Sequence, residues 1–195
     1  MKRKLVPMLA LASGLALTTA ACGQKSDNSD NPGGANPTAT APDTGATEAA
    51  ATPASSDHAA QFLTDAIKGD NGEIRMGKAA ESMGSSQGVK DFGKMLVADH
   101  TKHKDQAVAI AKAMNVPVPD GTTPEADSAY KMTTSMSGGG FDKDFVSAMI
   151  DDHKKDIDKF QQEAASSDPA QVTDFAKQSL PTLKKHLQTA QSLQK

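Results

Sequence analysis

The chain has 195 residues, a formal net charge of -3 and 4% aromatic residues, and it contains no tryptophan. Neither this charge nor any local basic stripe indicates a nucleic-acid partner. The only cysteine is Cys22, which excludes an internal disulfide. Roughly the first 55 residues have a composition that cannot build a core, and the remaining length, about 140 residues, is typical of one domain.

Residues 1–21 are predicted to be a lipoprotein signal peptide. Lys2-Arg3-Lys4 is basic, and the apolar stretch that follows is too short to span a membrane. The run LALTTAAC resembles a bacterial lipobox with Cys22 as the lipidated first mature residue, although Thr19 stands where leucine is usual. The alternative is an ordinary cleaved signal with an incidental cysteine. By resemblance, the Gly-Gln pair after the cysteine favours an outer-membrane lipoprotein facing the periplasm, with a lipid anchor as its membrane contact.

Residues 22–56 are predicted to be the lipidated cysteine and a disordered linker. The segment is rich in Ala, Thr, Pro, Gly, Asn and Ser and lacks apolar periodicity, so it cannot offset the entropy cost of ordering. A flexible coil of this length would reach roughly 30 Å and hold a folded domain away from a membrane.

Residues 57–195 are predicted to form one helical domain. A first helix is expected over about 57–82, with Gly69 and Gly72 each costing about 1 kcal/mol. After a short Gly-Ser-Ser turn, a second helix is expected over about 87–114. Because the turn is short, these two helices should be antiparallel neighbours.

A proline-containing loop then leads to a short helix over about 124–136, with Thr123 as N-cap and a proline at its first position. Three glycines, 138–140, are expected to end it. A third long helix should begin at Asp142 as N-cap, with Phe141 stapled onto Val146, and end near residue 166.

A fourth long helix, over about 169–194, should be capped by Asp168 and kinked at Pro181. Two helical hairpins joined by a long crossover describe an all-α, ferritin-like four-helix bundle with a short crossover helix.

A repeated pattern points to the centre of this bundle. Residues 91–100 read DFGKMLVADH and residues 144–153 read DFVSAMIDDH. Residues four apart share a helix face, so each copy places a histidine, His100 or His153, in an apolar stripe. The stripes also contain other polar residues: Glu73, His103, Asp156 and His186.

Three histidines and one carboxylate from four helices suit a transition metal, and Glu73, His100, His153 and His186 are the candidate ligands. Zinc, iron, copper and manganese all remain candidates. Asp99 and the equivalent Asp152 point about 100° away and are better as outer-shell or capping groups.

The alternative is a structural polar cluster in which Glu73 and a histidine satisfy each other without metal. No glutamate precedes any histidine by three residues, which argues against a di-iron oxidase or an iron-storage cage. His103 is expected to be exposed, and neither it nor His58 is assigned a role.

The four segments FLTDAIKGDNGEIRMGKAA, VKDFGKMLVADHTKH, FDKDFVSAMIDDHKKDIDKF and DFAKQSLPTLKKHLQTA resemble the exported bacterial family called domain of unknown function 4142. The resemblance covers about residues 57–194 and implies a ferritin-like fold and an envelope location. It implies no established activity. Two functions are therefore weighed: an envelope metal-binding protein, and a non-catalytic structural or stress-related interaction module without metal. An enzyme is the third choice, because no nucleophile elbow or phosphate-binding loop is present, and no catalytic or cofactor-binding residue is assigned.

Overall fold

The computed structural model describes residues 53–194. The predicted signal peptide, Cys22 and nearly all of the linker lie outside these residues. Five helices follow one another along the described chain: α1 (Pro53–Met83), α2 (Gln87–Ala113), α3 (Pro124–Thr134), α4 (Gly138–Ala164) and α5 (Ala170–Leu193). The all-α prediction is confirmed, and α1 begins at Pro53 rather than at residue 57.

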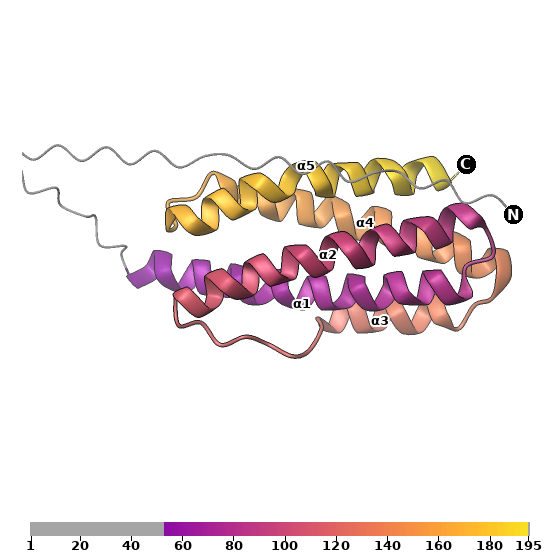
Figure 1. Ribbon diagram of the computed structural model, residues 1–195, viewed down its shortest axis with the longest axis horizontal. Coiled ribbons are helices and arrows are strands. Elements are labelled where there is room, and N and C mark those ends of the chain that lie inside the picture. The colour runs from indigo at the N-terminus through magenta and orange to yellow at the C-terminus, as the bar shows by residue number, and fades with distance from the viewer. Residues whose placement is uncertain (1–52, 195) are drawn as a thin grey trace, which may run out of the picture. The chain divides into compact units, whose positions relative to one another are not determined.

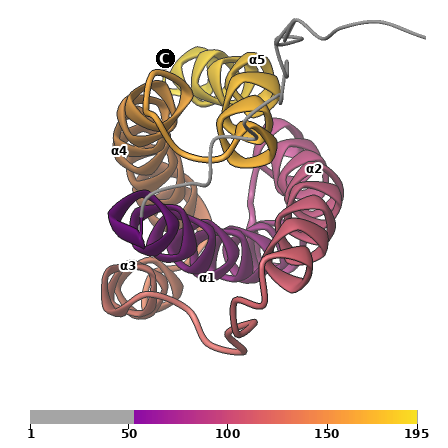
Figure 2. The same ribbon diagram turned by 90° about the vertical axis from the view of Figure 1, so that its left-hand side faces the viewer.

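The four long helices form the bundle, and α3 lies outside it. In the end-on view, α1, α2, α5 and α4 follow one another around the core, and α3 packs beside α1 and α4 (Figures 1 and 2). Arg75 of α1 holds α3 in place, because its guanidinium lies 2.7 Å from Asp127 and 3.7 Å from the ring centre of Tyr130. The crossover between the two hairpins therefore runs along the outside of the bundle.

A pair of glycines sets the distance between α1 and α2. A Cβ atom at Gly93 would lie 2.6 Å from the carbonyl oxygen of Gly77, and one at Gly77 would lie 2.8 Å from that of Gly93. Neither distance is compatible with a side chain, so the two backbones can approach this closely only with glycine at both positions.

The core consists of two apolar clusters with a polar layer between them. One cluster includes Phe62, Phe160 and Phe175, and the other includes Phe92 and Phe145. On each long helix, one or two buried polar residues lie between residues of the first cluster and residues of the second. These residues are Asp70, Glu73, His100, His153 and His186, and the buried Ser179 and the partly buried His103 adjoin them. The apolar stripes predicted from the sequence therefore converge on one internal polar layer.

Two of the predicted helix caps are wrong. Helix α4 begins at Gly138, which has φ +57°, so the glycine run starts this helix instead of ending the previous one. Asp142 consequently lies inside α4, and its carboxylate accepts hydrogen bonds from the backbone N–H groups of Ser85 and Ser86 at 2.7 and 2.8 Å. It caps the turn before α2, a partner far away in sequence.

Asp168 does not cap α5 either. Its carboxylate accepts a 2.7 Å hydrogen bond from Nδ1 of His58, while Pro169 precedes the first helical residue without a side-chain cap. The predicted cap of α3 is confirmed, since the Thr123 hydroxyl accepts from the N–H of Ala126 at 3.1 Å. Pro181 lies within a continuous α5.

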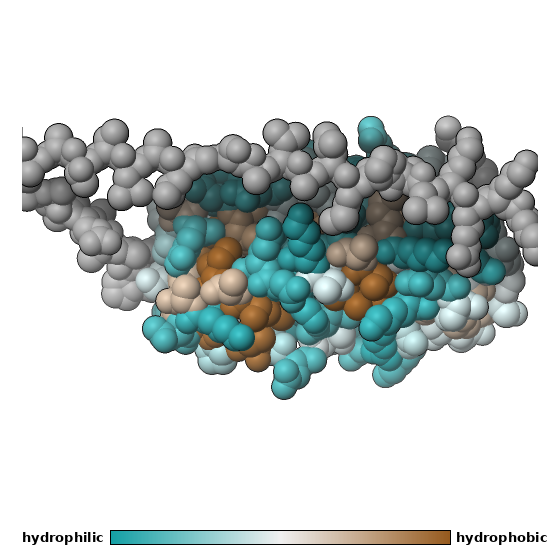
Figure 3. All heavy atoms as spheres, viewed as in Figure 1, coloured by the Kyte–Doolittle hydropathy of each residue, from teal (hydrophilic) through white to brown (hydrophobic). Residues whose placement is uncertain are grey.

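Hydrophilic residues predominate on the face shown in Figure 3, and apolar residues appear there in small separate groups. Within residues 53–194, no helix combines the length and the apolar character that crossing a membrane requires.

Candidate metal centre

The four residues predicted to converge do so. His100 Nδ1 lies 2.9 Å from Glu73 Oε2, and His153 Nδ1 lies 3.3 Å from Glu73 Oε1. His153 Nε2 lies 3.2 Å from His186 Nδ1. Each residue comes from a different long helix, and all four side chains are almost completely buried.

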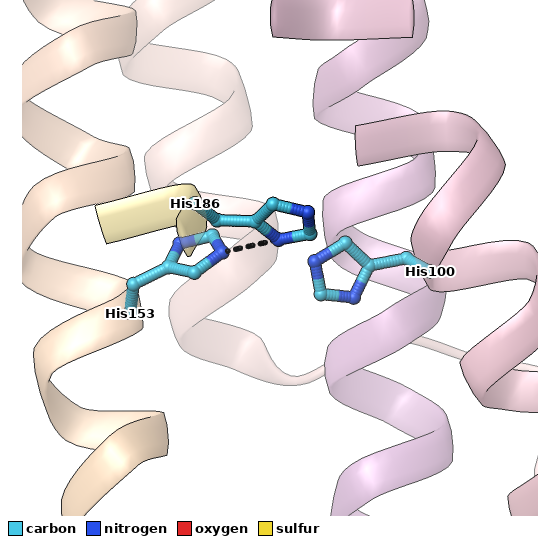
Figure 4. Close-up of side chains that lie close together, drawn as sticks. All are labelled: His100, His153 and His186. Carbon is cyan, nitrogen blue, oxygen red and sulfur yellow. Dashed lines mark hydrogen bonds between the residues drawn. The ribbon is translucent and has the colours of Figure 1, made fainter. Parts of the chain in front are cut away.

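The rings of His153 and His186 meet through nitrogens that carry no hydrogen when the rings are neutral. His153 Nδ1 lies 2.9 Å from the carbonyl oxygen of Met149, and His186 Nε2 lies 2.9 Å from the carboxylate of Asp99. Carbonyl and carboxylate oxygens only accept, so these two outer nitrogens hold the hydrogens. The inner nitrogens, His153 Nε2 and His186 Nδ1, lie at hydrogen-bonding distance, the contact drawn as a dashed line in Figure 4. With the hydrogens on the outer nitrogens, both inner nitrogens present a lone pair.

His100 completes the same arrangement. Its Nδ1 lies 2.8 Å from Asp70 Oδ1 and 2.9 Å from Glu73 Oε2, so it too donates outward. Its Nε2 is buried and has no hydrogen-bond partner within residues 53–194. Figure 4 shows this nitrogen turned towards the other two rings. One nitrogen from each of His100, His153 and His186 lies within 4.8 Å of the others.

Metal-binding histidines characteristically donate their second N–H to a carboxylate or a backbone carbonyl, which fixes the tautomer and the ring orientation. All three rings have this outer partner, so the layer presents three inward nitrogens, each of which can ligate when its ring is neutral. Glu73 lies beside the outer nitrogens of His100 and His153 and pairs with that of His100, so it does not join the inner donor face. Asp99 contacts the outer nitrogen of His186 and does not face the inner nitrogens.

Burial and charge set the protonation of the cluster. Burial lowers the pKa of His153 and brings that of His186 to about 4, so both rings are neutral at pH 7. Burial also acts to lower the pKa of His100, but the carboxylates of Glu73 and Asp70 outweigh it and raise the pKa well above the usual value. Burial alone would raise the pKa of Glu73, yet the neighbouring histidines lower it to about 2. Without metal, the cluster thus holds a His100–Glu73 ion pair.

The sequence analysis missed three members of this layer. Asp70 is 2% exposed and accepts from both His100 and His103. His103, which was expected to be exposed, has a side chain only 14% exposed, and its Nε2 lies 2.8 Å from the Ser179 hydroxyl. The spacing of Asp70 and Glu73 could have identified Asp70 as a buried residue, because residues three apart share a helix face.

Two further clusters of possible ligand side chains are present among the described residues. The first adjoins the three histidines, and the second lies apart from them. Glu73, Asp152 and Asp156 bring carboxylate oxygens within 4.8 Å of one another. A ring nitrogen of His58 and carboxylate oxygens of Glu163 and Asp168 likewise lie within 4.8 Å of one another near the α4–α5 turn, where the His58 side chain is 62% exposed. The second cluster ties the beginning of α1 to the α4–α5 turn.

A cavity of about 260 Å³ reaches the centre between α2 and α5. His100 and His186 form part of its wall, and Asp99, Lys102 and Gln178 are among its other lining residues. A small molecule or an ion can therefore approach two of the three rings from this side.

Fold and site together define an all-α helical bundle with a buried histidine–carboxylate layer. The chain belongs to the family described as "Domain of unknown function (DUF4142)", whose model matches residues 44–193. This confirms the resemblance seen in the sequence. The structure is similar to the crystal structure of a DUF305 fragment from Deinococcus radiodurans, with a TM-score of 0.64 and 12% identity over 73% of this chain and 96% of that one. At this identity the likeness shows the fold alone. No curated protein matches the sequence.

Proposed function

We propose that this protein is a lipid-anchored cell-envelope protein that binds one transition-metal ion in the core of its helical bundle. His100, His153 and His186 are the ligands, and Glu73, Met149 and Asp99 hold their rings from outside. The observation that carries the proposal is the orientation of three buried imidazoles, each with its outer nitrogen engaged and its inner nitrogen turned to a common point.

The spacing suits a tetrahedral ion. Zinc–nitrogen bonds of about 2.0–2.1 Å place neighbouring ligand nitrogens roughly 3.3 Å apart. His153 Nε2 and His186 Nδ1 are 3.2 Å apart. Imidazole donors suit zinc, copper and iron better than magnesium or calcium. Three protein ligands leave a fourth position for water or a small ligand, and the cavity beside His100 and His186 gives access from solvent.

The alternative is a structural cluster that binds no metal. A gain in folding stability alone would not explain why such a cluster is buried here. Burying ionised groups costs free energy that their mutual attraction often fails to recover, and well-packed apolar residues frequently do better. The layer lies between two apolar clusters that could have continued through it. Two imidazole lone pairs 3.2 Å apart also repel each other unless a proton or a metal ion lies between them.

The experiment is a thermal-unfolding titration of protein purified without a polyhistidine tag. Adding zinc, copper or iron should raise the melting temperature of the wild type, because a ligand that binds only the folded state stabilises it by mass action. His153→Ala should abolish this rise. His58→Ala is the matched control, because it removes a histidine from a different cluster, and it should keep the rise.

In a structural cluster, His153→Ala would lower the melting temperature equally with and without metal. The two functions are therefore distinguished by whether the effect of His153→Ala on the melting temperature depends on added metal. If zinc, copper, iron and manganese all leave the wild-type melting temperature unchanged, the metal proposal is wrong.

The location is proposed from the sequence. Lipidation at Cys22, followed by a linker without apolar periodicity, would place the domain in the periplasm beside the outer membrane. A metal site in this compartment would bind, sense or buffer envelope metal.

A further inference from the structure

A second group of acidic side chains lies on the far side of Glu73 from the three-histidine site. Asp152 and Asp156, one helical turn apart on α4, bring carboxylate oxygens within 4.8 Å of each other and of Glu73. We propose that Glu73, Asp152 and Asp156 bind a second divalent cation of the oxygen-preferring class, such as Mn²⁺ or Mg²⁺. The inference rests on the proposed function only in placing Glu73 outside the donor set of the histidine site.

The oxygen atoms of Glu73 support this assignment. Oε2 pairs with His100, whereas Oε1 is buried and lacks a hydrogen-bond partner among residues 53–194. His153 Nδ1 is 3.3 Å from Oε1 but directs its hydrogen to the Met149 carbonyl, so it leaves this oxygen unsatisfied. A buried carboxylate oxygen without a partner is costly, and a cation would satisfy it.

The chemistry of the three side chains points the same way. Glu73, Asp152 and Asp156 offer carboxylate oxygens within 4.8 Å of one another. Donor sets made only of oxygen are those that magnesium, calcium and manganese prefer.

The site has its own route to solvent. A cavity of about 220 Å³ is lined by Glu73, Asp152, Met149 and Lys155, with Gly72 and Ala126 at the contact between α1 and α3. The cavity described for the histidine site opens instead between α2 and α5. Two ions could therefore enter the two sites from different sides.

The test uses the full-length protein with zinc already bound at the histidine site. Mn²⁺ is titrated in, and the free ion is counted by its electron paramagnetic resonance signal. Wild type should bind one Mn²⁺ per chain. Asp152→Asn/Asp156→Asn should lose at least nine-tenths of this binding while its zinc content stays unchanged.

The matched control is Asp105→Asn/Asp158→Asn, which changes net charge equally at two exposed positions and should bind Mn²⁺ like wild type. If the double variant at the site loses its helical circular dichroism, the single substitutions Asp152→Asn and Asp156→Asn replace it. Absence of Mn²⁺ binding by wild type, or equal binding by the site variant, overturns the inference.

The two proposals fail separately. If zinc does not bind, the histidine proposal is wrong, and the same Mn²⁺ titration on metal-free protein still decides the carboxylate site. His153→Ala provides the converse check, because it should lose zinc and keep Mn²⁺.

Discussion

The carboxylate of Asp99 lies 2.9 Å from Nε2 of His186 and turns Nδ1 of the same ring towards His153. Asp99 and His186 are on different helices and 87 positions apart in the chain. The side chain of Asp99 is 36% exposed at the cavity beside the centre, whereas His186 is fully buried. A residue at the cavity wall thus determines which nitrogen of a buried ring faces inward.

Asp99→Ala should weaken metal binding about 10–100-fold, because the His186 ring loses the acceptor that selects its tautomer. The change is measured by competition with a chelator of known affinity. Asp105→Ala, an exposed aspartate on the same helix, is the control and should bind as wild type. Equal affinities in the two variants would show that Asp99 does not orient His186.

Metal binding at pH 7 should release about one proton, and His100 is its source. The pKa of His100 is raised by Glu73 and Asp70 against the effect of burial, whereas His153 and His186 are already neutral. Only a deprotonated nitrogen can ligate, so the ion must displace the proton of His100. Calorimetric titrations in buffers of different ionisation enthalpy count the released protons. A value near zero or near three would contradict this assignment.

Replacing a glycine in α2 and replacing one in α1 should have opposite effects on the free energy of unfolding. Gly93→Ala should lower the free energy of unfolding by about 1–3 kcal/mol, because the new Cβ meets the Gly77 carbonyl at the helix crossing. Gly69→Ala should raise it by about 0.5–1 kcal/mol, since no atom lies within 4 Å of its Cβ and alanine favours the helix. Urea unfolding measures both, and a stabilising Gly93→Ala would disprove the close crossing.

Asp142→Ala should destabilise the domain by about 1–2 kcal/mol at pH 7, because two backbone N–H groups lose their acceptor. Burial would raise the pKa of Asp142, but the hydrogen bonds from Ser85 and Ser86 lower it below the usual value.

A depressed carboxylate pKa contributes stability above the pKa of the unfolded chain and loses it as pH falls through the folded value. The difference between wild type and Asp142→Ala should therefore be constant above about pH 5 and shrink below about pH 4. Urea unfolding from pH 7 to pH 3 checks this, with Asp158→Ala as the exposed control. A difference that grows on acidification would reverse the assigned sign.

Cys22→Ser should leave an unlipidated precursor that no longer fractionates with membranes. The basic start, the apolar run and the small residues before the cysteine motivate this expectation. Metabolic labelling with a fatty acid and membrane fractionation measure it. If the variant stays in the membrane fraction to the same extent, Cys22 is not the anchor.

The sequence by itself determined the number and order of the helices and most of the residues that face inward. Helical periodicity depends only on spacing, so Phe92, Leu96 and His100 had to share a face of their helix. The equivalent apolar stripe in α4 placed His153 in the core in the same way. Two helical hairpins joined by a crossover can pack together in only a few ways. The structure has the predicted arrangement, a bundle of four long helices.

Only the tertiary structure decided which atoms meet. Asp70 and Ser179 enclose His103, Asp142 caps the turn before α2, and Asp168 pairs with His58, each across a long sequence separation. Periodicity specifies the face of a helix but not the rotation of a ring or the height of its partner on a neighbouring helix. Those depend on how closely the backbones pack, so the inward nitrogen of each histidine became visible only once the four helices were together.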